Sequence, residues 1–212
     1  MRQSSEMPDI AIFPDSIRTK RMLLRQYCVS DGQAIMELVD RNRGRLLRSF
    51  PEIAKGLTNS AEVASFLAEK FELWKTRRTF CFGIWLLAGD ILIGQLQVKN
   101  VVWKVPAAEM SYFIDAQFLR QGHATEAIAN VVDVAFNLLD FQRVFLRIIR
   151  TNAESLALAD RLGFRREGVL RNDFRCGLGE LHDVHVVSRI AQDYFDGPAN
   201  KSRWCLQSGR FG

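Results

Sequence analysis

The stretch A-E-M-S-Y-F-I-D-A-Q-F-L-R-Q-G-H-A-T-E-A, residues 108–127, sets the architecture of this chain. Its first half is apolar and aromatic, which predicts a β-strand. Its second half is a short turn around Gly122, and a long apolar helix is expected to begin near Thr125. A strand that enters a helix through such a turn leaves backbone N–H groups of the first helical turn unpaired, and together with the helix dipole they attract an anion. The stretch therefore predicts a phosphate-binding turn.

Hydrophobic periodicity and turn residues predict the elements on both sides. Before the stretch we expect a strand at 22–24, a helix capped by Ser30 or Asp31, a helix from 59 or 60 to about 77, and a hairpin of strands 80–87 and 91–103 that forms a meander with 109–115. After it we expect a helix at 125–139, a strand at 143–150, a short helix at 152–162 stopped by Gly163, and strands at 164–169 and 180–190. The helix between strands 109–115 and 143–150 predicts a right-handed parallel crossover.

This order of elements predicts a single α/β domain. We expect a mixed, mostly antiparallel, twisted sheet of about six to seven strands, flanked by about four helices. The domain is expected to span residues 17–196. Residues 1–16 show no sustained period and are expected to form a loosely ordered arm, and residues 197–212 are expected to form a tail.

The segment Arg41–Thr58 interrupts the helical pattern, because Gly44, Pro51 and Gly56 punctuate it. It combines arginines with apolar residues, which suits a loop that covers a site. A solvated connection with a few anchoring apolar residues explains the same composition equally well.

Composition narrows the classes of function. The 212 residues are 48% hydrophobic and contain no apolar run long enough for a membrane span, so we expect a cytoplasmic protein that does not associate with a membrane. The four cysteines are scattered, with no C-x-x-C and no histidine at metal-ligand spacing, so we expect free thiols and no metal. The net charge of +5 comes from dispersed residues, which disfavours nucleic-acid binding and fits a phosphate-rich small molecule or an acidic partner.

Three segments in order resemble the GNAT superfamily of acetyl-CoA-dependent N-acetyltransferases: A-E-M-S-Y-F-I-D, then Q-G-H-A-T-E-A, then R-V-F-L-R-I-I-R-T-N-A-E-S-L-A-L-A-D-R-L-G-F. The resemblance covers residues 17–195 and is greatest to the Rim-type branch, which acetylates the N-terminal amines of ribosomal proteins. It implies a sheet that splays between its fourth and fifth strands, 109–115 and 143–150, with the pantetheine arm of coenzyme A in the gap.

The resemblance also implies the coenzyme-binding residues. The pyrophosphate loop of the family falls on residues 119–124, where Gly122 and Ala124 match, but Leu119 replaces the usual Gln or Arg and Arg120 replaces a common glycine. Because such loops hold phosphate mainly through backbone N–H groups, we expect a weakened site that still binds. The full set implied is Tyr112, Phe113, Ile114, Leu119, Arg120, Gln121, Gly122, His123, Ala124, Thr125, Asn152 and Ser155.

Two residues are candidates for the chemistry. Glu109 lies near the splayed strand, where related enzymes carry a glutamate base, and is expected to take the proton of the amine; a solvent-facing strand residue explains it about as well. Ser155 is expected to give a proton or a hydrogen bond to the departing thiolate, and capping of the short helix is the alternative. The resemblance places His182 and Asp183 beside the acceptor, where ordering of the sheet is the alternative role.

The acceptor is expected to be a primary amine. The resemblance places Phe50 and Glu52 at the acceptor. A protein or peptide N-terminus is preferred to a polyamine or an aminoglycoside as the acceptor. The segment 41–58 carries several arginines, whose positive charge disfavours a small polycation: Arg41, Arg43, Arg45 and Arg48. A coenzyme A-binding or ribosome-associated module without catalysis is the alternative from another class. Association with the ribosome and formation of a homodimer are left open.

Overall fold

The computed structural model describes residues 13–196. Its helices are α1 (Gly32–Ser49), α2 (Pro51–Gly56), α3 (Ser60–Lys75), α4 (His123–Asn137), α5 (Ala153–Arg161) and α6 (Ala191–Asp196), with short 3-10 turns at Val29–Asp31 and Ala116–Phe118. Its strands are β1 (Ser16–Arg18), β2 (Met22–Gln26), β3 (Phe80–Leu86), β4 (Ile91–Val102), β5 (Ala107–Ile114), β6 (Arg143–Ile149), β7 (Arg165–Arg175) and β8 (Leu181–Ile190). None of these described helices is long and apolar enough to cross a membrane. The predicted tail and residues 1–12 of the predicted arm lie outside the described residues.

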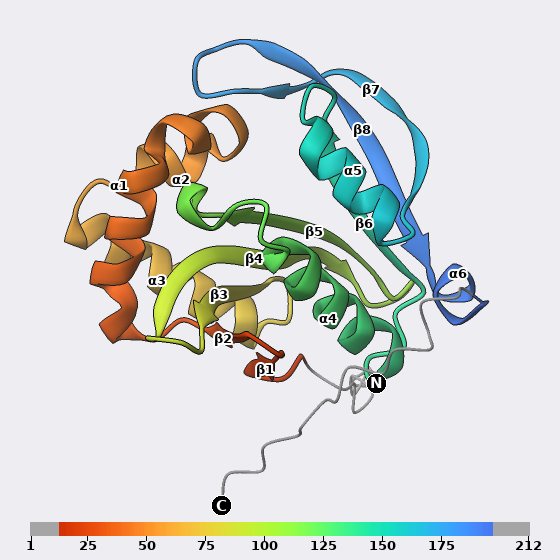
Figure 1. The fold of residues 1–212 in the computed structure, drawn as a ribbon, viewed down its shortest axis with the longest axis horizontal. Coiled ribbons are helices and arrows are strands. Elements are labelled where there is room, and N and C mark those ends of the chain that lie inside the picture. The colour runs from red at the N-terminus through yellow and green to blue at the C-terminus, as the bar shows by residue number, and fades with distance from the viewer. Residues whose placement is uncertain (1–12, 197–212) are drawn as a thin grey trace, which may run out of the picture.

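The strands form one eight-stranded sheet in the order β1-β2-β3-β4-β5-β6-β8-β7 (Figure 1). Neighbouring strands are antiparallel except β5 and β6, which run parallel and are joined through α4. This confirms the predicted single α/β fold, its mixed sheet and the meander β3–β4–β5. The sheet has one strand more than the predicted range, because β1 pairs with β2 over only three residues and is too short to show a period in the sequence.

β5 and β6 separate halfway along β5. Their pairing ends with Met110 opposite Leu146, although β5 continues to Ile114. Beyond that point β5 stays paired with β4, and β6 stays paired with β8. The facing edges of β5 and β6 therefore border a widening gap, which confirms the splay that the resemblance implied.

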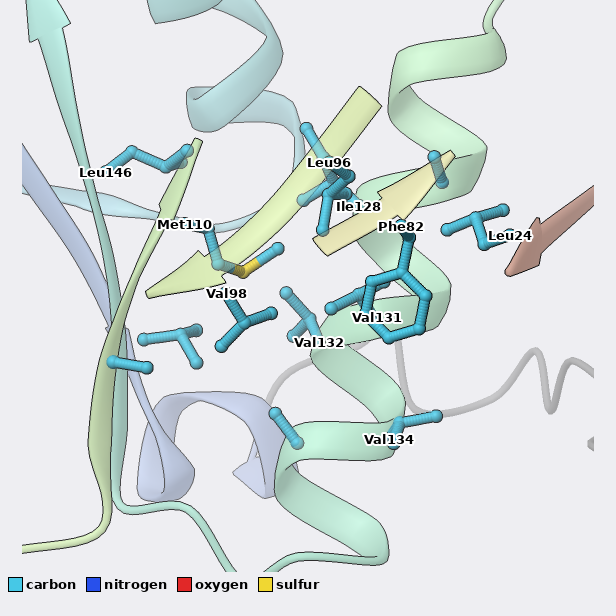
Figure 2. Packing of buried hydrophobic residues seen from close by; sticks show 14 of the residues in the cluster. Leu24, Phe82, Leu96, Val98, Met110, Ile128, Val131, Val132, Val134 and Leu146 are labelled. Carbon is cyan, nitrogen blue, oxygen red and sulfur yellow. The ribbon is translucent and has the colours of Figure 1, made fainter. Parts of the chain in front are cut away.

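Helix α4 packs across one face of the sheet and forms the larger core. Figure 2 shows Ile128, Val131 and Val132 of α4 facing Leu96 and Met110 of the sheet. Apolar residues of α5 belong to the same core, whereas α1 and α3 enclose a second core on the opposite face. The two faces follow from strand alternation, in which successive side chains point to opposite sides. The gap between β5 and β6 thus opens between two layers of helices.

The first described residues belong to the larger core. Phe13 falls in the predicted arm, yet its side chain is 1% exposed. Its ring packs against Phe80, with the ring centroids 4.8 Å apart, and also contacts Phe82 and Phe141. The chain is therefore anchored on the sheet before β1 begins.

The segment Arg41–Thr58 is largely helical, so the loop conformation predicted in both alternatives is wrong, although residues of the segment do line a cavity. α1 runs through its first half and α2 through its second half. Leu38, Asn42 and Leu46 recur every fourth residue and are buried, which holds α1 on the sheet. Gly44 lies on the open side, with no atom within 4 Å of the position that a Cβ would take. A glycine there costs the helix only about 1 kcal/mol, which this burial outweighs.

β7 and β8 form a long hairpin that reaches past α5 toward α1 and α2 (Figure 1). β7 extends six residues beyond the predicted end of its strand at Val169. The sequence conceals the extension because Asn172, with a φ of 51°, and Asp173 are poor strand formers. Pairing resumes at Phe174, opposite His182.

The tip of this hairpin touches α1. The N–H of Gly177 donates to the carbonyl of Leu47 at 2.6 Å. A Cβ at Gly177 would lie 2.7 Å from that carbonyl oxygen, so the close approach requires glycine. The hairpin therefore bridges the two halves of the sheet above the gap.

Candidate active site

Two cavities share the gap between β5 and β6. The loop cavity, of about 980 Å³, is bordered by the turn before α4, by α5 and by the end of α1. The helix cavity, of about 1010 Å³, is bordered by α2, α3 and the hairpin. Residues that line both cavities mark their junction: Ser49, Phe50, Tyr112, Ile149, Asn152 and Ser155. Two molecules, one in each cavity, would therefore come together beside Tyr112 and Ser155.

The turn before α4 has the backbone of an anion site. Gly122 has a φ of 79°, in the left-handed region that favours glycine. The N–H of Glu126 donates to the carbonyl of Gly122 at 3.0 Å and begins the helical pattern. Within residues 13–196, the N–H groups of residues 120–125 find no hydrogen-bond acceptor outside α4. These groups lie at the positive end of α4, so they can hold a phosphate as the sequence predicts.

Arg21 and Thr19, between β1 and β2, anchor this turn through Glu126. The Glu126 carboxylate accepts hydrogen bonds from the Thr19 hydroxyl (2.7 Å), the Arg21 N–H (2.9 Å) and the Arg21 guanidinium (2.7 Å). The guanidinium also donates to the carbonyl of Gln121 at 2.8 Å. Burial alone raises the pKa of Glu126, but the hydrogen bonds from Thr19 and Arg21 outweigh it and hold that pKa below its usual value. Arg21 thus neutralises a carboxylate that would otherwise repel a phosphate.

Sequence reasoning missed this anchor. Arg21 and Glu126 are 105 positions apart, and no local pattern relates them. In the sequence Arg21 is only one of two basic residues, with Arg25, that flank the predicted strand at 22–24. Its role follows from the packing of β1 and β2 beside the first turn of α4.

The loop cavity is cationic. Among the described residues, four arginines and one carboxylate, that of Glu154, line it. The arginines are Arg45, Arg48, Arg120 and Arg161. Arg120 is highly exposed and pairs with Glu154 at 3.1 Å. A ligand with several phosphates is therefore favoured in this cavity.

This placement corrects the prediction that the arginines of 41–58 face the acceptor. Arg45 and Arg48 line the loop cavity and not the helix cavity, because α1 ends at the junction of the two. Arg41 pairs with Asp115 at 3.0 Å, and Arg43 donates to the carbonyl of Leu57 at 2.8 Å. These two arginines tie α1 to β5 and α2, and their charge is not directed at a ligand.

Most of the predicted turn residues line the loop cavity: Leu119, Arg120, Gly122, His123, Ala124 and Thr125. Gln121 is directed elsewhere, since its side chain donates to the carbonyl of Gln117 at 3.2 Å. His123 is 5% exposed, and its Nδ1 lies 3.3 Å from the carbonyl oxygen of Phe118. The turn therefore presents mainly its backbone to the cavity.

The edge of β5 offers backbone groups to the gap. The N–H of Asp115 donates to Ile93 of β4 at 2.7 Å. Since backbone groups alternate in direction along a strand, Phe113 also faces β4, whereas Tyr112 and Ile114 face the gap. The carbonyl of Ile114 accepts from Arg45 at 3.2 Å. The geometry thus favours Tyr112 and Ile114 as backbone contacts, and the predicted backbone contact of Phe113 is wrong because its groups pair with β4.

Tyr112 and Ser155 form the polar pair at the junction. The Tyr112 hydroxyl donates to Ser155 Oγ at 3.1 Å. Burial raises the pKa of Tyr112 while the hydrogen bond with Ser155 lowers it less, so the phenol stays protonated. The N-cap of α5 is Asn152, whose side-chain oxygen accepts from the N–H of Ser155 at 3.1 Å. Asn152 therefore performs the capping that was the alternative role of Ser155, and the Ser155 hydroxyl is left for the gap.

Glu109 lies in the helix cavity and is buried. Its side chain is 5% exposed, accepts from Asn100 Nδ2 at 2.9 Å and pairs with Lys99 at 3.2 Å. The alternative of a solvent-facing strand residue is therefore wrong. Glu109 precedes Tyr112 by three residues, which is about 10 Å along a strand, and the two side chains leave opposite faces. A proton moving from the junction to Glu109 would need a chain of several waters, and Ser111 lines the cavity between them.

Phe50 and Glu52, predicted to lie at the acceptor, both line the helix cavity. Phe50 lines both cavities and its ring packs against Phe113, with centroids 5.4 Å apart. Glu52 lines the helix cavity from the first turn of α2 and forms no ion pair within the described part of the chain. His182 instead lines the loop cavity. Asp183 accepts from the N–H of Asn172 at 3.1 Å, which serves the hairpin.

Comparison with known families gives one match that covers most of the chain. A family described as an acetyltransferase (GNAT) domain matches residues 21–165. An uncharacterised N-acetyltransferase of Bacillus subtilis, YoaA, is 30% identical over 177 residues, which cover 82% of this chain and 96% of that protein. The matched range contains the turn before α4 and both strands of the gap.

Solved structures share the fold. RimL, described as a ribosomal L7/L12 α-N-protein acetyltransferase in complex with coenzyme A, aligns with a TM-score of 0.78 and 22% identity, over 84% of this chain and 99% of its own. RimJ of Mycobacterium smegmatis, in complex with a coenzyme A disulfide, aligns with a TM-score of 0.78 and 21% identity, over 91% and 98%. At 21–22% identity, these comparisons establish a shared fold and nothing about the acceptor.

Proposed function

This chain belongs to the GNAT family of acetyltransferases, and we propose that its acceptor is the N-terminal α-amine of a protein or peptide, with ribosomal proteins as the first candidates because the fold is shared with RimL. The family defines the reaction as the acetyl-CoA-dependent transfer of an acetyl group to an amine nitrogen. The balance of charge in the helix cavity is the observation that carries the choice of acceptor.

The helix cavity is large and has no excess of carboxylates. A small polycation such as a polyamine favours a strongly acidic cavity. Here the carboxylates and the cations match one for one: Glu52, Glu62, Glu69 and Glu109 against Lys70, Lys99, Arg147 and Arg175. Because the charges of this cavity balance among the described residues, and Glu52 on α2 forms no ion pair there, a chain that carries one ammonium group suits the cavity better than a polycation. The volume of about 1010 Å³ is at the upper end of the range for small-ligand sites, which also favours a peptide.

The modest base in this cavity suits an α-amine. The attacking amine must be neutral. An α-amine with a pKa of about 7.7–8.0 is roughly one-tenth neutral at pH 7, whereas a lysine near 10.4 costs roughly 4–5 kcal/mol to deprotonate. Glu109, which pairs with Lys99, is the carboxylate that we propose as the proton acceptor in this cavity. An N-terminal amine needs no stronger one.

The loop cavity fits coenzyme A. The free N–H groups of the turn before α4 suit the pyrophosphate, and Arg48 and Arg161 add positive charge for a further phosphate. The backbone edge at Tyr112 and Ile114, which β6 leaves without strand pairing, suits the amides of the pantetheine arm. This arm would then lead from the loop cavity into the gap and end near Tyr112 and Ser155.

Tyr112 and Ser155 are placed to serve the departing sulfur. Acetyl-CoA, when bound, supplies the thioester whose acetyl carbon the amine attacks. As the C–N bond forms and the C–S bond breaks, the Ser155 hydroxyl gives its proton to the thiolate. Ser155 takes a replacement proton from Tyr112, whose hydroxyl already donates to its Oγ, and Tyr112 regains a proton from solvent. On the other side of the strand, Glu109 takes the amine proton through water beside Ser111.

A thiol-release assay with a matched set of amines tests the acceptor class. The set contains peptides with free N-termini, the same peptides N-terminally blocked but carrying internal lysines, spermidine and an aminoglycoside. We expect turnover with the free peptides alone, and mass spectrometry should place the acetyl group on the α-amine.

Two other outcomes would contradict the proposal at different levels. Turnover restricted to spermidine or the aminoglycoside would replace the acceptor class and leave the acetyltransferase assignment intact. Binding of acetyl-CoA, seen by calorimetry, without turnover of any amine would favour the alternative of a coenzyme A-binding module.

A further inference from the structure

Three potential metal ligands meet at the tip of the β7–β8 hairpin. They are the thiol of Cys176, the carboxylate of Glu180 and the imidazole of His182, whose ligand atoms all lie within 4.8 Å of one another. Glu180 Oε2 and His182 Nε2 are 3.5 Å apart. The acetyl transfer described above uses none of these three side chains.

The hairpin holds the three residues on one face. The N–H of Cys176 donates to the carbonyl of Glu180 at 2.9 Å, so these two residues oppose each other across the turn. The turn is closed by a second bond, from the N–H of Gly179 to the carbonyl of Cys176 at 3.0 Å. Opposed residues in an antiparallel pair have neighbouring side chains, and His182 follows Glu180 by two positions on the same face. The backbone therefore sets the spacing without any metal.

We propose that this cluster binds a transition-metal ion, with Zn²⁺ as the best match. A thiolate, an imidazole and a carboxylate are the three side-chain types that bind Zn²⁺ in proteins. With bonds of about 2.0–2.1 Å, the nitrogen and oxygen ligands of a tetrahedral site lie about 3.4 Å apart. The Glu180–His182 distance of 3.5 Å already meets this requirement. A rotation of the Cys176 side chain brings its sulfur in, and the thiol proton passes to solvent.

The charge and position of the cluster support the proposal. A thiolate and a carboxylate supply two negative charges, which match a divalent ion. Cys176 is 4% exposed, so its sulfur is shielded, while Glu180 and His182 keep the cluster open to an entering ion. The next residue, Gly177, bonds to Leu47 of α1, and His182 lines the loop cavity. A metal would therefore brace the hairpin where it reaches across the two cavities.

The proposal runs against the sequence-level expectation of no metal. The spacing, Cys-x-x-x-Glu-x-His, matches no common zinc motif, so cysteine and histidine spacing does not reveal it. Only the turn at residues 177–179 brings the thiol beside the other two ligands.

Titration of the metal-free full-length protein with Co²⁺ tests the site. We expect one Co²⁺ per chain, with the intense near-ultraviolet absorption of a cobalt–thiolate bond and the visible bands of a tetrahedral ion. Zn²⁺ should then displace Co²⁺, because this kind of site prefers zinc over cobalt. Cys176→Ser should abolish the thiolate band, and His182→Gln should weaken Co²⁺ binding by roughly 10-fold or more.

The other cysteines and a second histidine provide matched controls. Cys28→Ser, Cys205→Ser and His185→Gln should keep the band and the affinity of the unaltered protein. Because Cys176 is buried, its variant is checked by circular dichroism, and His182→Gln remains a test if Cys176→Ser does not fold. The proposal is overturned if the unaltered protein shows no cobalt–thiolate band, if Cys176→Ser keeps it, or if His182→Gln binds Co²⁺ as tightly as the unaltered protein.

Discussion

Glu109 combines burial with charge at the floor of the helix cavity. Lys99 and Asn100 from the neighbouring strand satisfy its carboxylate. A carboxylate buried without partners is unfavourable, so these two contacts stabilise Glu109 on a central strand of the sheet.

Replacing Glu109 with Gln removes the base and keeps the shape. We expect kcat to fall by about 10- to 100-fold, and the pH profile of kcat to move upward toward the pKa of the acceptor amine. The measurement is kcat against pH with a free N-terminal peptide. Glu72→Gln, on the exposed side of α3, should leave the profile unchanged. An unchanged profile for Glu109→Gln would remove this residue as the base.

Tyr112 and Ser155 should act as a unit. We expect Ser155→Ala and Tyr112→Phe each to lower kcat by about 10-fold with little change in the KM of the peptide, since both affect the departing sulfur. The double variant should lose little more than either single variant, because removing one hydroxyl already disrupts the pair. Steady-state kinetics of the three variants measure this. Additive losses would mean that the two hydroxyls act separately, and unaltered kinetics for Ser155→Ala would end its catalytic role.

At the scale of elements, the turn before α4 depends on the backbone of Gly122. Its φ of 79° is unfavourable for alanine by roughly 1–2 kcal/mol. Gly122→Ala should lower Tm by about 2–8 °C and also raise the KM of acetyl-CoA, because the N–H groups of the turn change direction. Gly163→Ala is the matched control, with a φ of 77° at the end of α5. It should lower Tm similarly and leave that KM unchanged, and an equal rise in KM would show that the effect is global.

The contact between β1–β2 and α4 should tune coenzyme binding. Arg21→Ala leaves Glu126 buried, charged and close to the phosphate site. We expect the KM of acetyl-CoA to rise about 10-fold, equivalent to about 1.4 kcal/mol, while kcat changes little. Lys20→Ala removes the same charge from an exposed neighbour and should have little effect. An equal rise in the KM of acetyl-CoA for both variants would contradict the prediction, because it would mean that only the overall positive charge matters and not the contact of Arg21 with Glu126.

At the scale of the whole molecule, several carboxylates favour the folded state at neutral pH. Burial raises the pKa of Glu126, but hydrogen bonds from Thr19 and Arg21 lower it further, so the net pKa is lowered. Burial likewise raises the pKa of Asp31, and the hydrogen bonds from Arg25 outweigh this effect and lower it. A hydrogen bond from Arg143 lowers the pKa of Glu167 despite some burial. These folded-state pKa values lie below the ordinary values of 4.5 for Glu and 3.8 for Asp, so the unfolded chain takes up protons first.

Stability should therefore fall in acid. The contribution of these groups is present above about pH 4.5 and is lost as the pH falls through their lowered values. Urea unfolding between neutral pH and about pH 3 measures the loss as a decreasing free energy of unfolding. Glu126→Gln should be less stable at neutral pH and lose less of its stability in acid. Glu37→Gln, on the exposed side of α1, should follow the unaltered protein, and the prediction fails if Glu126→Gln does so too.

Long-range contacts limited what could be predicted about the site. The pattern of 41–58 was misread because Gly44 and Pro51 weigh heavily in a local analysis, whereas the burial of Leu38, Asn42 and Leu46 against the sheet keeps α1 intact. The same error led to the wrong prediction that the arginines of this segment face the acceptor, because the cavity that Arg45 and Arg48 line depends on where α1 ends. The capping role expected as an alternative for Ser155 belongs to Asn152, and only the packing of α5 beside β5 brings Ser155 to Tyr112.

The sequence by itself determined the features that depend on short-range chemistry. The strand, glycine turn and helix of 108–127, the start of a helix at residue 59 or 60 and the stop at Gly163 follow from backbone angles and hydrophobic period within a few residues. The tertiary structure alone decided which side chains meet: Arg21 with Glu126, Tyr112 with Ser155, and Cys176 with His182. Such contacts depend on the packing of whole elements against one sheet, which no local pattern of residues encodes.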